Sequence, residues 1–161
     1  MSITRIISGG QTGADQAGLF AAEDLAIATG GWMPKDGLTE TGSNLALLAR
    51  FRMTEHSSSS YTARTLANIL AADGTFICAP RLSPGSRQTY ALAVAQNRPI
   101  FVLSTERLHL GARQNDIAFA TWLRVHDIKT LNVAGNRESV SPGIFDRLRD
   151  YLVCQLGVTP C

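Results

Sequence analysis

The sequence predicts an α/β protein: a three-layer sandwich in which helices cover both faces of a mostly parallel sheet of five or six strands. Short β-rich runs alternate with longer segments whose apolar residues recur at helical spacing, which is the pattern of βα units. The length of 161 residues suits one compact domain, taken here as residues 1–161. A chain this long buries roughly 70% of its unfolded surface, so its core requires neither disulfides nor metals.

The first half of the chain predicts three strands and two helices. A strand at Ile3–Ser8 precedes a helix at Ala14–Ala28, whose apolar residues have helical spacing. A short apolar piece, Ile27–Trp32, predicts the second strand, and Arg50–Thr54 predicts a third. A run of four serines then leads into a helix at Tyr61–Ala72, where a serine can serve as the N-cap.

The second half alternates more regularly and predicts the remaining elements of the sandwich. They are a strand at Thr75–Ala79, a helix at Arg87–Gln96, a strand at Ile100–Leu103, a helix at Arg113–Val125, a strand at Thr130–Val133 and a helix at Ile144–Leu156. Pro142 stands just before the last helix, where a proline suits the first turn. Right-handed crossovers are expected between the parallel strands.

The composition excludes several classes of protein. With 45% hydrophobic and 17% charged residues the chain is not disordered, and a net charge of +2 is too small for bulk nucleic-acid binding. No apolar run approaches the ~20 residues of a membrane span and no signal peptide is present, so a cytoplasmic protein without membrane contact is expected. His56, His109 and His126 are isolated, so no metal site is predicted.

A glycine-rich loop follows the first predicted strand, at the sheet edge where open α/β sheets bind ligands. Its candidate binding residues are Gly9, Gly10, Gln11, Thr12, Gly13 and Asp15. Free N–H groups at the start of the next helix favour an anion, and glycines allow close approach; the alternative is a tight structural turn. The carboxylate of Asp15 would repel a phosphate, unless it binds a metal or a ribose hydroxyl of the ligand. Its simpler role is to place a negative charge in the first turn of the helix, where a carboxylate is favoured.

Two further polar loops follow later strands, and we expect all three loops at the same end of the sheet. The second loop and the helix after it contribute Arg81, Gly85, Ser86 and Thr89, and the third contributes Gly135, Asn136 and Arg137. All but two of the 15 basic residues are arginines, whose planar fork matches phosphate and carboxylate groups. Three such loops together predict a site for a phosphorylated ligand with a sugar or ring, although each loop alone could be an ordinary surface turn.

Other side chains could reach the same site. Lys35 follows the second predicted strand and could contact an anion or be solvated. Arg64 and Asn68 lie one helical turn apart and could share a face toward the site or toward solvent. Trp32 could stack on a ring, but packing in the core is its simpler role.

Five segments of the chain carry a family resemblance. ISGGQTGADQAGL, TGGWMPK, YTARTLAN, DGTFI and LNVAGNRES resemble the putative molybdenum carrier proteins, from Ile7 to about Leu152. That family belongs to a Rossmann-like superfamily related to the LOG, or lysine-decarboxylase-like, proteins. The resemblance implies a Rossmann-like fold, a homo-oligomer, and a nucleotide or molybdenum cofactor (a pterin phosphate) as ligand. The positions it matches are Gly9, Gly10, Gln11, Thr12, Gly13, Lys35, Arg64, Asn136 and Arg137.

One departure from the LOG pattern bears on activity. LOG phosphoribohydrolases carry PGGxGTxxE, in which the glutamate serves hydrolysis of the N-glycosidic bond, whereas this chain reads PGSRQTYAL from Pro84 to Leu92. Leu92 stands in the place of the glutamate, and a leucine cannot act as an acid, a base or an electrostatic stabiliser. The sequence therefore disfavours this hydrolase activity and predicts no catalytic residue.

The residues favour a binding or carrier protein for a phosphorylated, nucleotide-like ligand, and the resemblance names molybdenum cofactor as the candidate. Two alternatives stay open. The first is a nucleotide-processing enzyme, such as a hydrolase, that uses Asp15 or Glu138 as its acid–base group with or without Mg²⁺. The second is a module that senses a nucleotide and signals to a partner protein.

Overall fold

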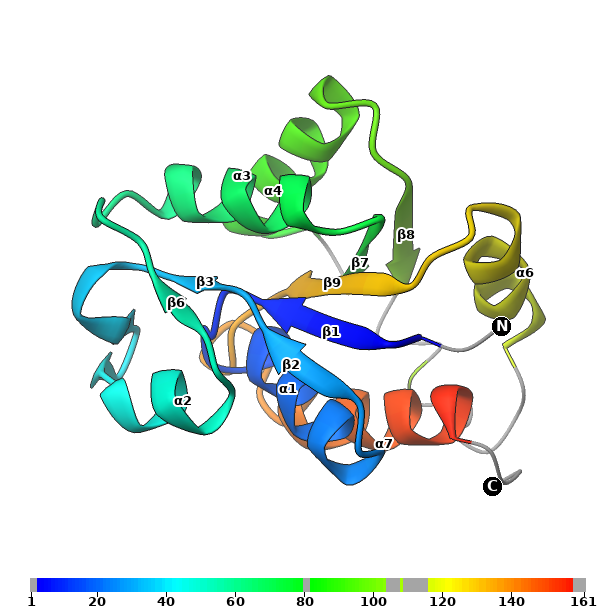
Figure 1. Cartoon of the computed structure of the whole chain (residues 1–161), viewed down its shortest axis with the longest axis horizontal. Helices are drawn as coiled ribbons and strands as arrows, with labels where there is room; N and C mark the ends of the chain where they lie inside the picture. The colour runs from blue at the N-terminus through cyan, green and yellow to red at the C-terminus, as the bar shows by residue number, and fades with distance from the viewer. Residues whose placement is uncertain (1–2, 80–81, 104–107, 109–115, 158–161) are drawn as a thin grey trace.

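A five-stranded sheet forms the centre of the molecule (Figure 1). The computed structural model describes residues 3–79, 82–103, 108 and 116–157. The strands are β1 (Arg5–Ser8), β2 (Ala28–Gly30), β7 (Gly74–Cys78), β8 (Ile100–Leu103) and β9 (Thr130–Gly135), in the order β2-β1-β9-β7-β8. Every neighbouring pair is parallel, so the predicted mostly parallel sheet of five or six strands has five.

Helices cover both faces of this sheet, which confirms the predicted three-layer sandwich (Figure 1). On one face α1 (Ala14–Asp24) packs against α7 (Ile144–Leu156), and on the other α3 (Tyr61–Ala71) packs against α4 (Pro84–Ala95). A further helix, α6 (Ile117–Val125), lies at the amino-terminal end of β9. None of the helices described is long and apolar enough to cross a bilayer.

The sheet is fixed by burial of its central strands. All five residues of β7 are buried, and Phe76 packs edge-on against Phe119 with ring centroids 5.1 Å apart. Tyr151 of α7 completes this aromatic cluster from the same face. Each fully buried aromatic or aliphatic side chain contributes about 1.5–3 kcal/mol, so the position of the strands is strongly determined.

Register brings the carboxyl ends of three strands to one edge. Ser8, the last residue of β1, lies opposite Val133, and Cys78, the last residue of β7, lies opposite Gly135. β9 lies between β1 and β7 and ends at the same edge. The three polar loops predicted from the sequence therefore leave the sheet on the same side.

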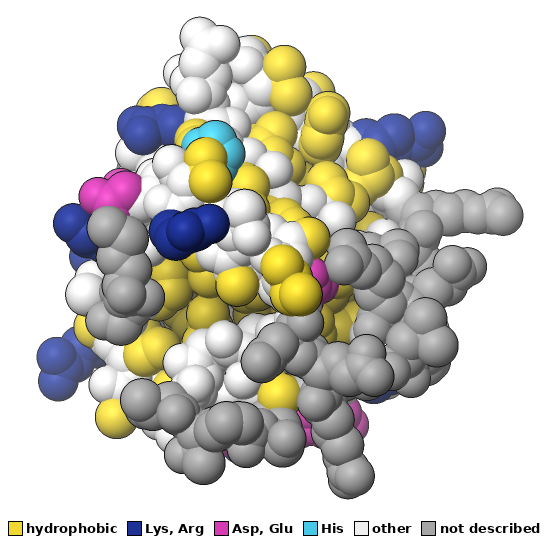
Figure 2. Space-filling view, turned by 90° about the vertical axis from the view of Figure 1, so that its right-hand side faces the viewer, with side chains coloured by type: hydrophobic (Ala, Val, Ile, Leu, Met, Phe, Trp, Pro, Cys, Tyr) yellow, Lys and Arg dark blue, Asp and Glu magenta, His cyan; other side chains and the backbone are white. Residues whose placement is uncertain are grey.

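β8 is the outermost strand on the side of the sheet away from β2, and it has no outer strand partner among the described residues. Figure 2 shows the right-hand side of the molecule as drawn in Figure 1, where β8 and α6 lie, and hydrophobic side chains are visible on that surface. The exposed large hydrophobic residues of the nearby elements are Tyr90 and Val94 of α4, Val102 of β8, and Ile117 and Val125 of α6.

Residues 32–55 form a small lobe beside the sheet. It contains β3 (Trp32–Met33), the 3₁₀ turn η1 (Lys35–Gly37), the antiparallel pair β4 (Leu38–Thr39) and β5 (Gly42–Ser43), α2 (Leu45–Arg50) and β6 (Thr54–Glu55). Its own small core gathers Met33, Leu47, Phe51 and Met53 around Leu19 of α1. The strand predicted at Arg50–Thr54 is wrong, because Arg50 ends a helix and Thr54 pairs with β3 outside the main sheet.

The predicted second strand, Ile27–Trp32, is divided between two sheets. Ala28–Gly30 pairs with β1, whereas Trp32 belongs to β3 in the lobe. The chain turns at Gly31, which has φ 117°, and a Cβ there would lie 2.2 Å from the carbonyl oxygen of Ser8. Asn68 of α3 holds the turn, since its side chain accepts from Trp32 N at 2.8 Å and donates to Trp32 O at 3.0 Å.

Two helix boundaries differ from the predicted ones by a few residues, and the local backbone explains each difference. α1 ends at Asp24 rather than Ala28, because Ala26 has φ 55° and the chain turns there into β2. α4 begins at Pro84 rather than Arg87, with Ser83 as its N-cap and the proline in the first turn. The predicted start of the helix at Arg113 lies outside the described residues.

We predict that Gly31→Ala lowers the free energy of unfolding by at least about 3 kcal/mol, because it combines a positive φ with a backbone clash. Gly42→Ala is the matched control. Gly42 also has a positive φ of 106°, but nothing lies within 4 Å of an added Cβ, so only the strain of about 1 kcal/mol is expected. Urea unfolding followed by circular dichroism measures both, and equal losses would contradict the clash.

Candidate functional site

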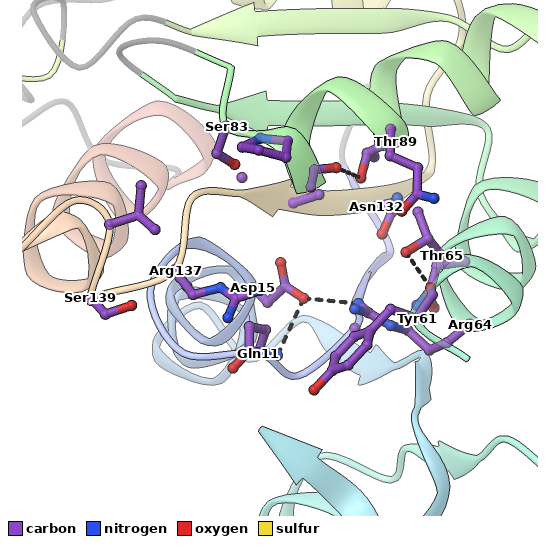
Figure 3. A pocket seen from close by; sticks show the side chains of 18 residues that line it. Gln11, Asp15, Tyr61, Arg64, Thr65, Ser83, Thr89, Asn132, Arg137 and Ser139 are labelled. Carbon is purple, nitrogen blue, oxygen red and sulfur yellow. Dashed lines mark hydrogen bonds and ion pairs between the residues drawn. The ribbon is translucent and has the colours of Figure 1, made fainter. Parts of the chain in front are cut away.

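A cavity of about 460 Å³ opens at the carboxyl ends of β1, β7 and β9 (Figure 3). It lies between α3 and α4 and the loops that follow β1 and β9. Eight of the predicted site residues line it: Gly9, Gln11, Asp15, Arg64, Gly85, Thr89, Gly135 and Arg137. The structure thus brings all three predicted loops, and α3, to one cavity of the size usual for small-molecule ligands.

Several lining residues were not among the predicted candidates. They are Tyr61 and Thr65 of α3, Ser83, Pro84 and Gln88 around the start of α4, and Asn132, Ala134, Ser139 and Val140 of β9 and the loop after it. The i, i+4, i+7 spacing of Tyr61, Thr65 and Asn68 was a signal for the first two, because these positions share one helix face with Arg64. Of the two orientations left open for Arg64 and Asn68, the structure has the one in which both side chains line the cavity.

Six predicted residues do not line the cavity. Gly10, Thr12, Gly13, Ser86 and Asn136 lie in the loops around it, and Lys35 is exposed in η1 of the lobe. Arg81 lies outside the described residues. Trp32 is half-buried, packs edge-on against His56 at 5.9 Å and does not line the cavity either.

The backbone of the first loop is largely satisfied by the protein itself. The donors and acceptors are Gly10 N to Ser8 Oγ (3.1 Å), Gln11 N to Asp15 Oδ2 (3.2 Å), Thr12 N to Gln11 Oε1 (3.0 Å) and Ala14 N to Asn136 O (3.1 Å). The expectation that these four N–H groups are free for an anion is therefore wrong. The acceptors are mainly side chains of the loop itself, which occupy the positions where anion oxygens would bind.

The glycines of this loop serve close packing instead. A Cβ on Gly9 would lie 1.3 Å from Nη1 of Arg64, because the guanidinium group rests on this residue. Gly13 has φ 76°, and a Cβ there would lie 2.6 Å from the carbonyl oxygen of Asn136, so the first and third loops touch through their backbones. Both positions need glycine because another group packs directly against the backbone there, and that group belongs to the protein and not to a ligand.

A buried ion pair between Asp15 and Arg64 crosses the floor of the cavity (Figure 3). Arg64 Nη1 lies 3.2 Å from Asp15 Oδ2, and the two side chains are 11% and 7% exposed. Burial raises the pKa of Asp15 above its ordinary value, although Arg64 and the N–H of Gln11 oppose the rise. Nε of Arg64 is buried without a hydrogen-bond partner in the described part of the chain, and Tyr61 lies with its ring centroid 5.6 Å from Arg64 Cζ.

The start of α4 forms a second wall of the cavity. Ser83 Oγ accepts from Ser86 N at 3.2 Å, and Ser86 Oγ in turn donates to Asn136 Oδ1 at 2.9 Å. Gly85 behaves differently from the other glycines, because its φ is not positive and a Cβ would meet nothing within 4 Å. No contact inside the protein requires glycine here, so the open space beside the helix N-terminus is left to the cavity.

Two residues of the third loop, Asn136 and Glu138, make hydrogen bonds that stabilise the fold. Asn136 N donates to Cys78 O at 3.0 Å, and its side chain donates to Ser141 Oγ at 3.1 Å. The Glu138 carboxylate accepts from the N–H groups of Gly143 and Phe145 and thereby caps α7. Glu138 does not line the cavity, so its candidate role as an acid–base group is not supported.

The described residues contain no group of three or more His, Cys, Asp and Glu side chains that could hold a metal ion.

Comparison with known proteins agrees with this architecture. Residues 6–156 match the circularly permutated YpsA SLOG family. The chain belongs to this family. Its structure is also similar to the crystal structure of a putative molybdenum carrier protein from Syntrophus aciditrophicus, with a TM-score of 0.84 and 36% identity over 94% of this chain and 93% of that one. The resemblance drawn from the sequence motifs is thereby confirmed. No curated protein matched the chain.

Asp15→Asn should change the pH dependence of stability. Because the pKa of Asp15 is raised by folding, the wild type binds more protons folded than unfolded, and it loses stability as the pH rises from about 4 through the folded pKa. The asparagine variant lacks this loss, so its stability relative to wild type rises over the same range. Urea unfolding at a series of pH values measures the difference. A relative stability that falls with rising pH would show that pairing with Arg64 outweighs burial.

Proposed function

We propose that this protein binds or carries a phosphorylated, nucleotide-like ligand, with molybdenum cofactor, a pterin phosphate, as the first candidate. The observation that carries the proposal is the division of one cavity into an anion-binding end and a ring-binding end. In Figure 3, Arg137, Ser139 and Ser83 come from one side of the cavity and Tyr61, Arg64 and Thr65 from the other, with Asp15 between them.

At the anion-binding end, a helix N-terminus and an arginine face the same space. The first turn of α4 presents positive dipole charge and the N–H of Gly85, whereas Pro84 has no N–H and Ser86 N donates to Ser83 Oγ. The missing side chain of Gly85 leaves room beside its N–H. Arg137, 46% exposed, reaches the cavity from the loop after β9. A phosphate group is the ligand chemistry that suits both features.

At the ring-binding end, an aromatic ring stands beside hydrogen-bonding side chains. Tyr61 is exposed at the cavity, where a heteroaromatic ring could stack on it. Thr65 and Asn132 are buried and line the same space. A purine or pterin, which has polar edges and flat faces, fits this combination.

The family relationship supports the same class of ligand. The similar protein from Syntrophus aciditrophicus carries the name of a putative molybdenum carrier, and molybdenum cofactor is therefore the candidate to test first. Leu92, which takes the place of the LOG glutamate, is half-buried in α4 and does not line the cavity.

One observation favours a second candidate, a nucleotide hydrolase. The Asp15 carboxyl lines the cavity and its pKa is raised, which is the property of a general acid. Product release from a panel of nucleotides, compared between wild type and Asp15→Asn, tests this candidate. Turnover that survives the substitution would remove Asp15 as the acid.

Isothermal titration with nucleoside monophosphates, nucleoside diphosphates and molybdenum cofactor tests the primary proposal. We expect saturable binding of at least one of these compounds. Absence of binding at about 100 μM of every phosphorylated compound would contradict the proposal, because a cavity with several charge-assisted hydrogen bonds should reach this affinity.

Two substitutions at the anion-binding end should weaken that binding without unfolding the protein. Arg137→Ala removes the cavity-facing guanidinium and should lower affinity about tenfold, whereas Arg124→Ala removes an exposed arginine of α6 far from the lining residues and should leave it unchanged. Gly85→Ala adds a methyl group in the open space and should weaken binding while keeping or slightly raising stability. Titration calorimetry with each variant checks both. Equal affinities for Arg137→Ala and Arg124→Ala would refute the anion-binding end.

A homo-oligomer and a cytoplasmic location, both expected from the sequence, stay predictions. The exposed hydrophobic residues near β8, including Val102 and Ile117, are a surface on which two copies could meet. Light scattering after size-exclusion chromatography measures the oligomeric state.

A further inference from the structure

A carboxylate from the lobe occupies the rim of the cavity. Glu40 stands in the turn between β4 and β5, and its side chain is only 13% exposed. It accepts hydrogen bonds from the hydroxyl groups of Thr12 and Ser139 and from Ser139 N at 3.2 Å. Arg137 Nε lies 3.8 Å from the same carboxylate. Glu40 therefore joins the lobe to the first and third loops.

The groups around Glu40 form a binding seat for an anion, here called the Glu40 seat: Thr12 Oγ1, Ser139 N, Ser139 Oγ and the Arg137 guanidinium. Two hydroxyl groups, one backbone N–H and an arginine are donors that would hold phosphate oxygens as well as carboxylate oxygens. Arg137 and Ser139 both line the cavity, so the seat adjoins the space assigned to the ligand. The chain fills this seat with its own negative charge.

The Glu40 carboxylate is held in its charged form. Partial burial pushes the pKa of Glu40 upward, but hydrogen bonds from Ser139 and Thr12 and the charge of Arg137 together place it below its ordinary value. At neutral pH the seat thus contains a full negative charge, which lies 3.8 Å from Arg137 Nε.

The β4–β5 hairpin is tied to the rest of the protein through one residue, Glu40. The hydrogen bonds from described residues 38–43 to parts of the chain outside the lobe all involve Glu40, including Glu40 N to Gln11 Oε1 at 2.9 Å. The other side-chain bonds of the hairpin, such as Thr39 Oγ1 to Gly42 O at 2.8 Å, stay within the lobe. With strands of only two residues each, the hairpin has little else to hold it at the cavity rim.

We propose that Glu40 is an internal competitor for the anionic group of the ligand: the phosphate takes over the Glu40 seat, the carboxylate leaves, and the β4–β5 hairpin is released from the rim. This inference rests on the proposed function and adds to it the residue that limits affinity for anions. A ligand whose anion cannot displace a carboxylate from two hydroxyl groups and an N–H would be excluded.

The test compares Glu40→Gln with the matched control Glu55→Gln, using inorganic phosphate as the probe and the Ser139 amide signal in ¹H–¹⁵N NMR spectra as the readout. Glutamine keeps the shape of the side chain but removes its charge. Glu55 belongs to the same lobe and accepts from Asp36 N at 2.9 Å, but it does not touch the seat. Glu40→Gln should shift the phosphate midpoint at least about tenfold lower than wild type, and Glu55→Gln should not shift it.

A midpoint that is unchanged or higher in Glu40→Gln would overturn the inference and show that Glu40 organises the donors. Thermal unfolding verifies that the variant is folded, and if it is not, Glu40→Asp, whose carboxylate is one methylene shorter, should shift the midpoint in the same direction. Hydrogen exchange of the hairpin amides gives an independent readout. It should accelerate when phosphate is added to wild type, and unchanged exchange would count against release of the hairpin.

Titration with adenosine 5′-monophosphate separates this inference from the proposed function. If the nucleotide binds wild type and Glu40→Gln equally well, the proposed function stands and the inference fails. If no phosphorylated organic compound binds any variant but Ser139 still responds to phosphate more readily in Glu40→Gln, the inference stands and the proposed function fails. If neither probe binds, both fail.

Discussion

Asp15 and Arg64 are buried together at the carboxyl end of β1, and neither could be buried alone. Removing one member of a buried pair leaves an uncompensated charge and typically costs about 3–5 kcal/mol. The pair joins the first turn of α1 to the first turn of α3, 49 residues further along the chain. Its geometry determines the first loop, since Arg64 rests on Gly9 and Asp15 holds the N–H of Gln11.

Because this pair and its neighbours satisfy the first loop, the cavity has its anion-binding groups elsewhere. The charge of Arg64 is largely neutralised by Asp15. Arg137 has its Nε 3.8 Å from the Glu40 carboxylate, but its side chain remains half exposed. The N-terminus of α4 stands open beside Gly85. At the floor of the cavity the charges of Asp15 and Arg64 thus offset each other. We therefore expect the negative charge of the ligand to bind at the rim, between α4 and the loop after β9. A displaceable carboxylate at that rim would make binding selective for strong anions.

The fold could be predicted from the sequence because its long elements carry clear periodicity. The burial of β7 and the helical spacing of α3 and α7 leave little choice of architecture. The lobe could not be predicted, because strands of two residues have no period and its turns depend on positions such as Gly31, whose partner is the backbone of β1. A helix at Leu45–Arg50 was missed for the same reason: only its cap, Asn44, marks so short a helix.

The three loops were predicted at the end of the sheet where the cavity lies, but the sequence did not show which of their groups face the cavity. Glycine-rich loops before helices are typical of anion sites, and nothing in the local sequence shows that Asp15 and Gln11 fold back onto the N–H groups of the loop. That arrangement depends on Arg64, which is distant in sequence. The sequence suggested Glu138 as an acid–base group, but its carboxylate accepts hydrogen bonds from the first N–H groups of α7 and caps that helix.

The most direct test of this account is the position of a bound phosphate. A crystal of the protein soaked with adenosine 5′-monophosphate should show the phosphate group beside Arg137 and Ser139, at the anion-binding end of the cavity, with the Asp15–Arg64 pair intact. A phosphate seated on the N–H groups of Gly10, Gln11 and Thr12, with Asp15 turned away from Arg64, would contradict it.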